Sequence, residues 1–198
     1  MLLVPAPGET IIGIDEVGRG CIAGPVVAAA VAWKLPVEGL GDSKKITPLR
    51  RAKLVPLIKQ ASAAFSIGQA SVEEIDQINI LQATFLAMRR ALESLPDEIM
   101  QNSRIWIDGN AMPVGMDADR VELFIGGDAT HAPISAASIL AKEWRDDLMK
   151  ESALLYPEFG FEKHMGYGTA YHLAALDRVG PCLLHRRTFA PVAKRIKK

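Results

Sequence analysis

Two adjacent carboxylates, Asp15 and Glu16, end a short run of β-forming residues and open directly into a glycine turn. Carboxylates at the mouth of a strand are rigidly held, and two of them side by side repel each other. A divalent cation or a shared proton is the usual relief for such a pair. Arg19 follows between Gly18 and Gly20, which allow a close approach of backbone to ligand. Acids for a metal, a guanidinium for phosphate and glycines for close approach predict chemistry on a phosphodiester.

Two more aspartates, each flanked by glycine, stand at similar places after strand-like runs. If those runs are neighbours in one sheet, the carboxylates converge at one edge, where ligands of α/β sheets usually bind. Hard cations such as Mg²⁺ and Mn²⁺ prefer carboxylate and water oxygens. A pair of such ions about 3.5–4 Å apart activates water for in-line attack on phosphorus. The candidate catalytic and metal-binding residues are therefore Asp15, Glu16, Asp108 and Asp128.

Each acid also has an ordinary interpretation. Asp108 with the glycine after it is a turn signal, and Asp128 fits a turn or the start of the following helix. Asp146 is a possible further site residue, but beside a helical arginine it equally fits a surface ion pair. Asp117 and Asp119 compete with Asp128, although their surroundings, rich in Met and Gly, favour a solvated loop.

The glycine pattern of residues 18–24 also resembles a dinucleotide-binding fingerprint. Two observations count against that function. The carboxylates of Asp15 and Glu16 would repel a pyrophosphate. Pro25 leads into a run of Val and Ala that is typical of a strand, so no helix N-terminus is available for the phosphates.

The bulk composition fits one domain. The chain has 198 residues, 49% of them hydrophobic, and a formal net charge of zero. Basic residues gather near the C-terminus, so a polyanion remains a possible ligand through metal ions. Cys21 and Cys182 match no zinc or disulfide pattern. Since the start of the chain has no signal-peptide pattern and no window resembles a membrane span, we expect a cytoplasmic protein.

Hydrophobic periodicity and capping signals predict alternating strands and helices. We expect strands at residues 10–15, 25–33, 63–70, 104–108 and 121–125. We expect a helix at about residues 48–60, a second that begins at residue 72 and a third at 79–95. Two more are expected at 135–152 and 169–179, and the last of these should be the final helix of the chain. Pro96 should end the third helix. Strands that first form a meander and then alternate with helices indicate an α/β fold whose sheet contains both parallel and antiparallel strands.

With these elements placed, the chain resembles ribonuclease HII, the bacterial type 2 ribonuclease H. The resemblance rests on seven blocks that follow one another in order over nearly the whole chain. They are the blocks at residues 14–20, 41–45, 78–84, 108–110, 127–146, 166–169 and 185–189. Each block alone is modestly specific, whereas all seven in sequence are highly specific.

The resemblance implies a ribonuclease H-like fold with a central five-stranded mixed sheet and a small C-terminal helical part from about residue 155 to 198. It implies metal-dependent cleavage of RNA in RNA/DNA hybrids, and cleavage 5′ of single ribonucleotides embedded in duplex DNA. The products would carry 3′-hydroxyl and 5′-phosphate ends. We expect these nucleic acids as partners, a monomer, no membrane contact and no evident protein partner.

The resemblance also assigns residues. The four acids would bind the metal ions, Mg²⁺ or Mn²⁺. Gly18, Arg19 and Gly20 would contact the ribonucleotide 2′-hydroxyl and a nearby phosphate, and Tyr167 would stack at the RNA–DNA junction. The 2′-hydroxyl is what distinguishes RNA from DNA, and tyrosine offers a flat face with a polar tip. The remaining substrate-binding candidates are Lys44 and Lys45, which either contact phosphates or lie in a solvated loop.

Three positions depart from the family pattern. Gly126 and Met165 stand where the family usually has lysines, and Ala190 stands where the family has the glycine of a Gly-Pro-Val. Two other functions remain open at this stage. One is a DNA-cutting nuclease or integrase-type enzyme of the same fold. The other is a catalytically silent hybrid-binding protein, although pure binding does not need a carboxylate cluster facing phosphate.

Overall fold

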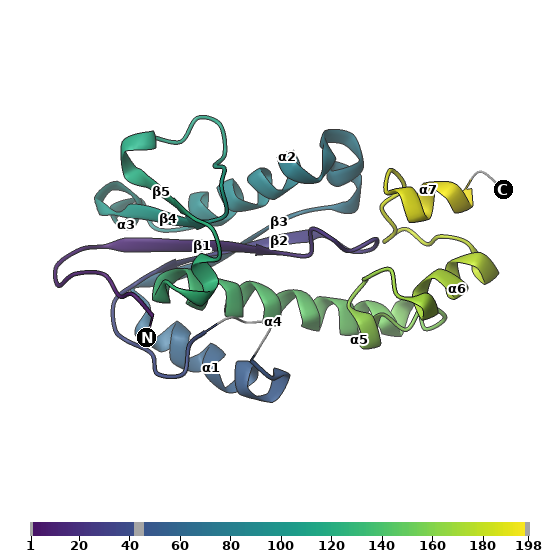
Figure 1. The fold of residues 1–198 in the computed structure, drawn as a ribbon, viewed down its shortest axis with the longest axis horizontal. Helices are drawn as coiled ribbons and strands as arrows, with labels where there is room; N and C mark the ends of the chain where they lie inside the picture. Colours follow the sequence, from purple (N-terminus) through teal and green to yellow (C-terminus); the bar gives the residue numbers. More distant parts are fainter. Residues whose placement is uncertain (1, 42–45, 197–198) are drawn as a thin grey trace.

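The computed structural model describes residues 2–41 and 46–196, and its centre is a five-stranded sheet (Figure 1). The strands are β1 (Ile11–Val17), β2 (Val26–Ala32), β3 (Ala64–Ala70), β4 (Arg104–Asp108) and β5 (Val121–Phe124). Their order across the sheet is β3-β2-β1-β4-β5. The β1–β2 and β2–β3 pairs are antiparallel, whereas the β1–β4 and β4–β5 pairs are parallel. The prediction of a mixed α/β sheet is confirmed.

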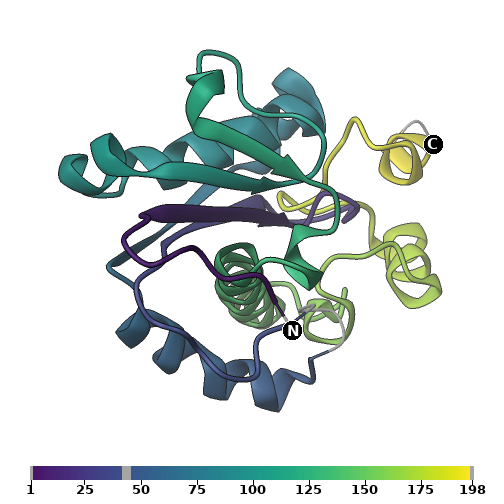
Figure 2. The same cartoon turned by 60° about the vertical axis from the view of Figure 1, so that its left-hand side comes forward.

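Helices cover both faces of this sheet, as the two ribbon views show (Figures 1 and 2). The long helix α2 covers one face, α1 and α4 cover the other, and α5 to α7 gather beyond one end. The helices are α1 (Pro48–Ala61), α2 (Val72–Glu93), α3 (Asp97–Asn102), α4 (Ala132–Leu155), α5 (Phe161–His164), α6 (Ala170–Val179) and α7 (Ala190–Ile196). Two short 3₁₀ turns, η1 (Ala118–Arg120) and η2 (Gly127–Ala129), flank β5.

Side-chain caps fix where the first helices begin. The Thr47 hydroxyl accepts a hydrogen bond from a backbone amide of α1. Ser71 and Glu74 form a reciprocal capping box at the start of α2, as predicted. Asn79 interrupts α2 with a positive φ of 67°, and its side-chain oxygen accepts from the amides of the next turn. The two helices expected here are therefore one helical element with a break at Asn79.

Three short helices were not predicted. Pro96 does follow α2, but it also caps the start of α3 rather than opening a loop. The helix α5 has only four residues, and α7 follows α6, so the prediction that α6 is the last helix was wrong. Helices of one or two turns carry too few residues for a clear 3.6-residue period.

Glycines let the two helical layers approach the sheet closely. A Cβ on Gly13 of β1 would lie 2.1 Å from the Pro133 carbonyl carbon in α4. A Cβ on Gly68 of β3 would lie 2.1 Å from the Ala87 carbonyl oxygen in α2. The backbone of α4 therefore lies directly against β1, two residues before Asp15.

The C-terminal helices enclose a cluster of aromatic side chains. His164, His172 and His185 are scattered in the sequence, but the structure buries all three together. The rings of His164 and His172 stack with centroids 4.4 Å apart, and the Nε2 atoms of His172 and His185 lie 2.9 Å apart. Phe159 and Phe161 line the same space. This cluster joins α5, α6 and the segment before α7.

Over residues 2–41 and 46–196, no helix is both long enough and apolar enough to cross a lipid bilayer.

We expect Gly13→Ala to destabilise the protein by about 1–3 kcal/mol or more, because the new methyl group would overlap the backbone of α4. Chemical denaturation of the two purified proteins measures the difference. Gly41→Ala is the matched control, since a Cβ there meets no atom of residues 2–41 and 46–196 within 4 Å. Its unfolding free energy should stay within about 0.5 kcal/mol of the parent. Equal stability of all three proteins would contradict the close approach of α4.

Acid should destabilise the histidine cluster. Burial lowers the pKa of both His172 and His185 to about 4. Because the unfolded chain then binds more protons than the folded one between about pH 6.5 and 4, the stability these neutral rings contribute is lost as pH falls through that range. Asp15 and Glu16, whose pKa values are raised by burial, act in the opposite direction.

The histidine contribution is isolated by comparing the parent with His172→Asn, since the acids titrate alike in both. We expect the unfolding free energy of the parent to fall more steeply between pH 7.5 and 5, by an amount on the order of 1–2 kcal/mol. Denaturant titrations at the two pH values give this difference. Identical pH dependence would contradict the neutral, buried state of His172.

Candidate active site

Parallel pairing brings Asp15 and Asp108 together. The register of β1 and β4 places Ile14 opposite Ile107, so the next residue of each strand is one of the two aspartates. Side chains at equivalent positions of paired strands point to the same face. For these two strands it is the face covered by α4, where Gly13 meets the helix backbone. The strand pairing therefore brings the Asp15 and Asp108 carboxylates close together, as expected from their positions at the ends of strand-like runs.

Burial and like charge act together on these acids. The Asp15 side chain is only 5% exposed. Burial is the main reason that its pKa lies well above the ordinary value, and the charges of Glu16 and Asp108 raise the pKa further. Burial also raises the pKa of Glu16, against the opposing effect of Arg19. A cation at this place would relieve both the repulsion and the lost hydration.

Hydrogen-bond donors hold each aspartate in place. Asp15 accepts from the backbone amide of Glu16 at 2.7 Å and from the Ser138 hydroxyl of α4. Asp108 accepts from the backbone amide of Gly127 at 2.7 Å. A side chain on Gly127 would overlap Ile134, since its Cβ would lie 2.5 Å from the Cδ1 atom. These contacts orient the carboxylates without neutralising them.

The turn η2 brings the fourth acid to the same end of the sheet. Asp128 follows Gly127, whose amide binds Asp108, and its own side chain is 5% exposed. Gly126 begins this turn with a φ of 70°, a left-handed conformation that suits glycine. The three segments that carry the four candidate acids therefore meet at one place.

The donor set fits a hard divalent cation. All four acids offer carboxylate oxygen, which Mg²⁺ and Mn²⁺ prefer, and the buried histidines lie in the separate cluster of the C-terminal helices. In residues 2–41 and 46–196, no three His, Cys, Asp or Glu side chains converge tightly enough to form a ready-made metal site. The acids thus share one region without forming a closed set of ligands.

The glycine loop between β1 and β2 borders these acids. The Arg19 side chain is half exposed and forms an ion pair with Glu16 at 3.3 Å. Gly18 has a φ of 95°, and a Cβ there would lie 2.3 Å from the Arg145 side chain. The loop leads into strand β2 and not into a helix, so it lacks the helix N-terminus that a dinucleotide site requires.

Two fully buried arginines hold this loop from beneath. Arg145 of α4 donates to the carbonyl oxygens of Ala23 and Pro25 and to that of Met165. Arg186 donates to three carbonyl oxygens of the loop itself, those of Gly18, Arg19 and Gly24. Each guanidinium is thus bound to three carbonyls contributed by distant parts of the chain. The loop is rigid in spite of its glycines.

Tyr167 lies beside the loop. A Cβ on Gly20 would lie 3.8 Å from the Tyr167 ring, and that ring is 46% exposed. The preceding Gly166 has a φ of 84°, and its carbonyl accepts from the amides of Ile22 and Ala23 at 2.9 and 3.3 Å. The structure therefore brings Gly18, Arg19, Gly20 and Tyr167 together next to the acids.

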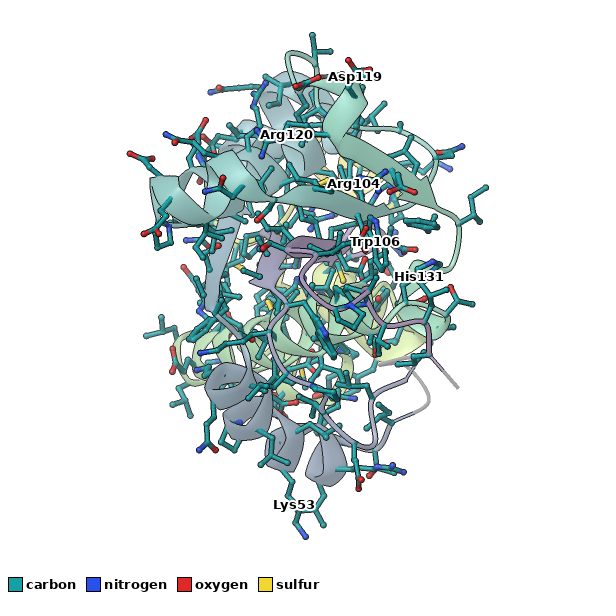
Figure 3. All side chains as sticks on the ribbon, turned by 90° about the vertical axis from the view of Figure 1, so that its left-hand side faces the viewer. Lys53, Arg104, Trp106, Asp119, Arg120 and His131 are labelled. Atoms are coloured by element: carbon teal, nitrogen blue, oxygen red, sulfur yellow. The ribbon has the colours of Figure 1, made fainter. Side chains whose placement is uncertain are left out.

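Other candidates lie apart from this group or outside the described residues. Asp146 pairs with Arg51 at 3.1 Å and with Lys142 at 2.5 Å, so it does form ion pairs, but it is buried and not at the surface. Asp117 and Asp119 are exposed around η1, and Figure 3 places Asp119 at the outer edge of the molecule. Lys44 and Lys45 lie outside the described residues.

Sequence reasoning gave no role to Arg145, Arg186 and Ser138. Arg145 and Arg186 stood inside recognised blocks, but nothing in their sequence neighbourhood indicates that they are buried. The bonds of both arginines span more than 100 residues, except for the one from Arg145 to Met165. Ser138 lies among small residues of α4, and only the approach of that helix to β1 reveals its contact with Asp15.

Comparison with known proteins places this geometry in a family. Residues 12–192 match the family model described as Ribonuclease HII. Ribonuclease HII of Sphingopyxis alaskensis is 55% identical over 185 residues, which cover 93% of this chain and 90% of that protein. Ribonuclease HII of Hyphomonas neptunium is 51% identical over 195 residues, covering 92% of this chain and 94% of that protein.

Solved structures agree on the fold. The ribonuclease H2 from Pyrococcus horikoshii OT3 aligns with a TM-score of 0.73 and 25% identity, covering 95% of this chain and 97% of that one. Bst-RNase HIII in complex with Mn²⁺ aligns with a TM-score of 0.77 and 20% identity, covering 96% of this chain and 70% of that one. The match to the family model over most of the chain and the high identity to its curated members lead to one assignment: this chain belongs to the ribonuclease HII family and is a ribonuclease H hydrolase.

Proposed function

We propose that this ribonuclease H hydrolyses the RNA strand of RNA/DNA hybrids and also cuts 5′ of a single ribonucleotide embedded in duplex DNA. The observation that carries the proposal is the juxtaposition of Tyr167 with Gly20, next to the two acids near the end of β1. A sugar lying against the exposed ring and the adjoining loop would present its 2′-hydroxyl to backbone groups. The adjoining phosphodiester would then face the carboxylates.

The acids form the hydrolytic part of the site. Asp15, Glu16, Asp108 and Asp128 would hold two divalent cations, Mg²⁺ or Mn²⁺. When bound, the cations supply a nucleophilic water and neutralise charge on the phosphate. The backbone amide of Gly127 and the Ser138 hydroxyl orient two of the carboxylates, so the ligands are fixed before substrate arrives. The products would carry 3′-hydroxyl and 5′-phosphate ends.

The glycine loop forms the recognition part. The guanidinium of Arg19 is available at the surface for a phosphate, although it also weakens the repulsion on Glu16 through their ion pair. Gly18 and Gly20 let the backbone approach the sugar. Since Arg145 and Arg186 fix the loop carbonyls, this surface is preorganised and its amides keep their direction when substrate binds. Lys44 and Lys45 are proposed as additional phosphate contacts.

The direct test uses a labelled DNA duplex that contains one ribonucleotide, beside an all-DNA duplex and a continuous RNA/DNA hybrid. We expect one cut on the 5′ side of the ribonucleotide, dependent on Mg²⁺ or Mn²⁺ and abolished by chelator. The all-DNA duplex should stay intact, because it offers no 2′-hydroxyl to the loop. Equal cutting of both duplexes would indicate the DNA nuclease, and binding without cleavage would indicate the silent binding protein.

Asp108→Asn separates catalysis from binding. The amide oxygen can still accept from Gly127, so the local fold should persist while one negative charge is lost. We expect the cleavage rate to fall by more than the roughly 10–100-fold that loss of an outer-shell partner of a metal typically costs. Substrate affinity should stay equal or increase, because repulsion of the phosphates decreases.

Single-turnover cleavage and a binding titration measure the two effects of Asp108→Asn. Asp119→Asn removes the same charge from an exposed position and is the matched control, for which parental rates are expected. Cleavage by Asp108→Asn at the parental rate would remove Asp108 from the site.

A further inference from the structure

The turn that carries Tyr167 is held from two sides. On one side, the Gly166 carbonyl accepts hydrogen bonds from the amides of Ile22 and Ala23 in the glycine loop. On the other side, the Tyr167 carbonyl lies 2.9 Å from the Nδ1 atom of His172, at the start of α6. The exposed Tyr167 ring thus stands on a backbone whose two carbonyls are both bound. The loop amides bind the Gly166 carbonyl, and His172 binds the Tyr167 carbonyl together with the Thr169 amide, which donates to it at 2.8 Å.

The partners of His172 determine where its proton lies. A carbonyl oxygen only accepts, so His172 carries its proton on Nδ1 and its Nε2 atom is an acceptor. The Nε2 atom of His185, 2.9 Å away, must then be the donor. This leaves the His185 Nδ1 atom to accept from the backbone amide of Cys182 at 3.0 Å. The hydrogen bonds admit one assignment, in which both rings are neutral and every proton points toward Tyr167.

The surroundings keep these rings neutral. Neither ring is more than 1% exposed, and the rings of Phe159 and Phe161 pack beside them. The titratable groups that face them are His164, which stacks on His172, and Cys182, whose sulfur lies 3.2 Å from His185. A second proton on His172 would set two N–H donors against each other. The chain of bonds from Cys182 to Tyr167 is therefore intact only in the neutral state.

We propose that His172, oriented by His185, is a positioning residue that sets the Tyr167 ring against Gly20 and so determines preference for an isolated ribonucleotide. This inference rests on the proposed function of the Tyr167 site. A duplex with one ribonucleotide offers a single 2′-hydroxyl, so the ring and the loop must meet it in one register. A continuous RNA strand offers a 2′-hydroxyl at every step and tolerates a displaced ring. Loss of the hydrogen bond from His172 to the Tyr167 carbonyl should thus reduce cleavage of the single-ribonucleotide duplex more than cleavage of the continuous hybrid.

His172→Leu removes the donor with little change in volume, and His172→Asn restores an N–H at the position of Nδ1. For His172→Leu we expect kcat/KM on the single-ribonucleotide duplex to fall about 10-fold more than kcat/KM on the continuous hybrid, since one hydrogen bond is at stake. His172→Asn should recover most of this ratio. Tyr171→Leu alters the neighbouring, half-exposed residue of α6 and should leave the ratio unchanged. Equal losses on both substrates, or no recovery with Asn, would overturn the proposal.

A second pair of variants serves if His172→Leu does not fold. His185→Gln keeps an Nε2–H donor toward His172 and should keep the substrate ratio, whereas His185→Leu should lower it. Proton–nitrogen NMR correlations of the parent protein at pH 7 read the tautomers without any substrate. We expect Nδ1–H for His172 and Nε2–H for His185, and the opposite tautomers would overturn the proposal. If the parent fails to cut the single-ribonucleotide duplex, the proposed function fails, while the tautomers are still measured.

Discussion

The repulsion among buried carboxylates at the ends of β1 and β4 is the constraint around which this molecule is arranged. Charges gathered in a poorly hydrated place destabilise the folded state unless donors or a cation stabilise them. The chain places neutral donors against two of the acids, the Gly127 amide and the Ser138 hydroxyl, and one cation, Arg19, at the exposed side. None of these removes the excess negative charge. A bound cation would relieve the repulsion that is left, which is the physical basis of the metal site proposed above.

The same constraint explains the use of glycine around the site. Ser138 reaches Asp15 because α4 packs directly on β1, and that packing requires Gly13 to have no side chain. The Gly127 amide reaches Asp108 because a side chain on Gly127 would overlap Ile134 and push the turn away. The close packing of α4 and of the turn η2 therefore places the hydrogen-bond donors that stabilise the charges of the acids. A core substitution there would alter the charge balance as well as the stability.

The fold was predictable where local signals decide it. Capping residues such as Thr47 and Ser71 and the strand-like runs gave the elements of the sheet and its main helices, because these signals act over a few residues. The acids, whose role stays a prediction, were identifiable as candidates because Asp15 and Glu16 lead from a strand-like run into a glycine turn and because Asp108 and Asp128 each stand beside glycine. The supports of the glycine loop were not, since Arg145 and Arg186 reach it across more than 100 residues. The buried pairing of Asp146 with Arg51, 95 residues away, was missed for a similar reason. The histidine cluster was missed because its burial depends on how the short C-terminal helices pack together.

Two of the three departures from the family pattern, Gly126 and Met165, remove a lysine without altering the backbone of the turn. Met165 and Gly126 both adopt left-handed backbone conformations, with φ of 51° and 70°, so each turn is kept while a lysine is absent. The Met165 side chain packs on the apolar cluster of the C-terminal helices, and its carbonyl is bound by Arg145. Arg145 and Arg186 are buried against carbonyls and cannot also reach a phosphate. Of the three arginines Arg19, Arg145 and Arg186, Arg19 is the one that the glycine loop holds at the surface. In the proposed function, a substrate phosphate and the Glu16 carboxylate would compete for this guanidinium, because Arg19 already pairs with Glu16. A bound metal ion, by offsetting the charge of Glu16, would leave Arg19 freer to bind the backbone of the nucleic acid.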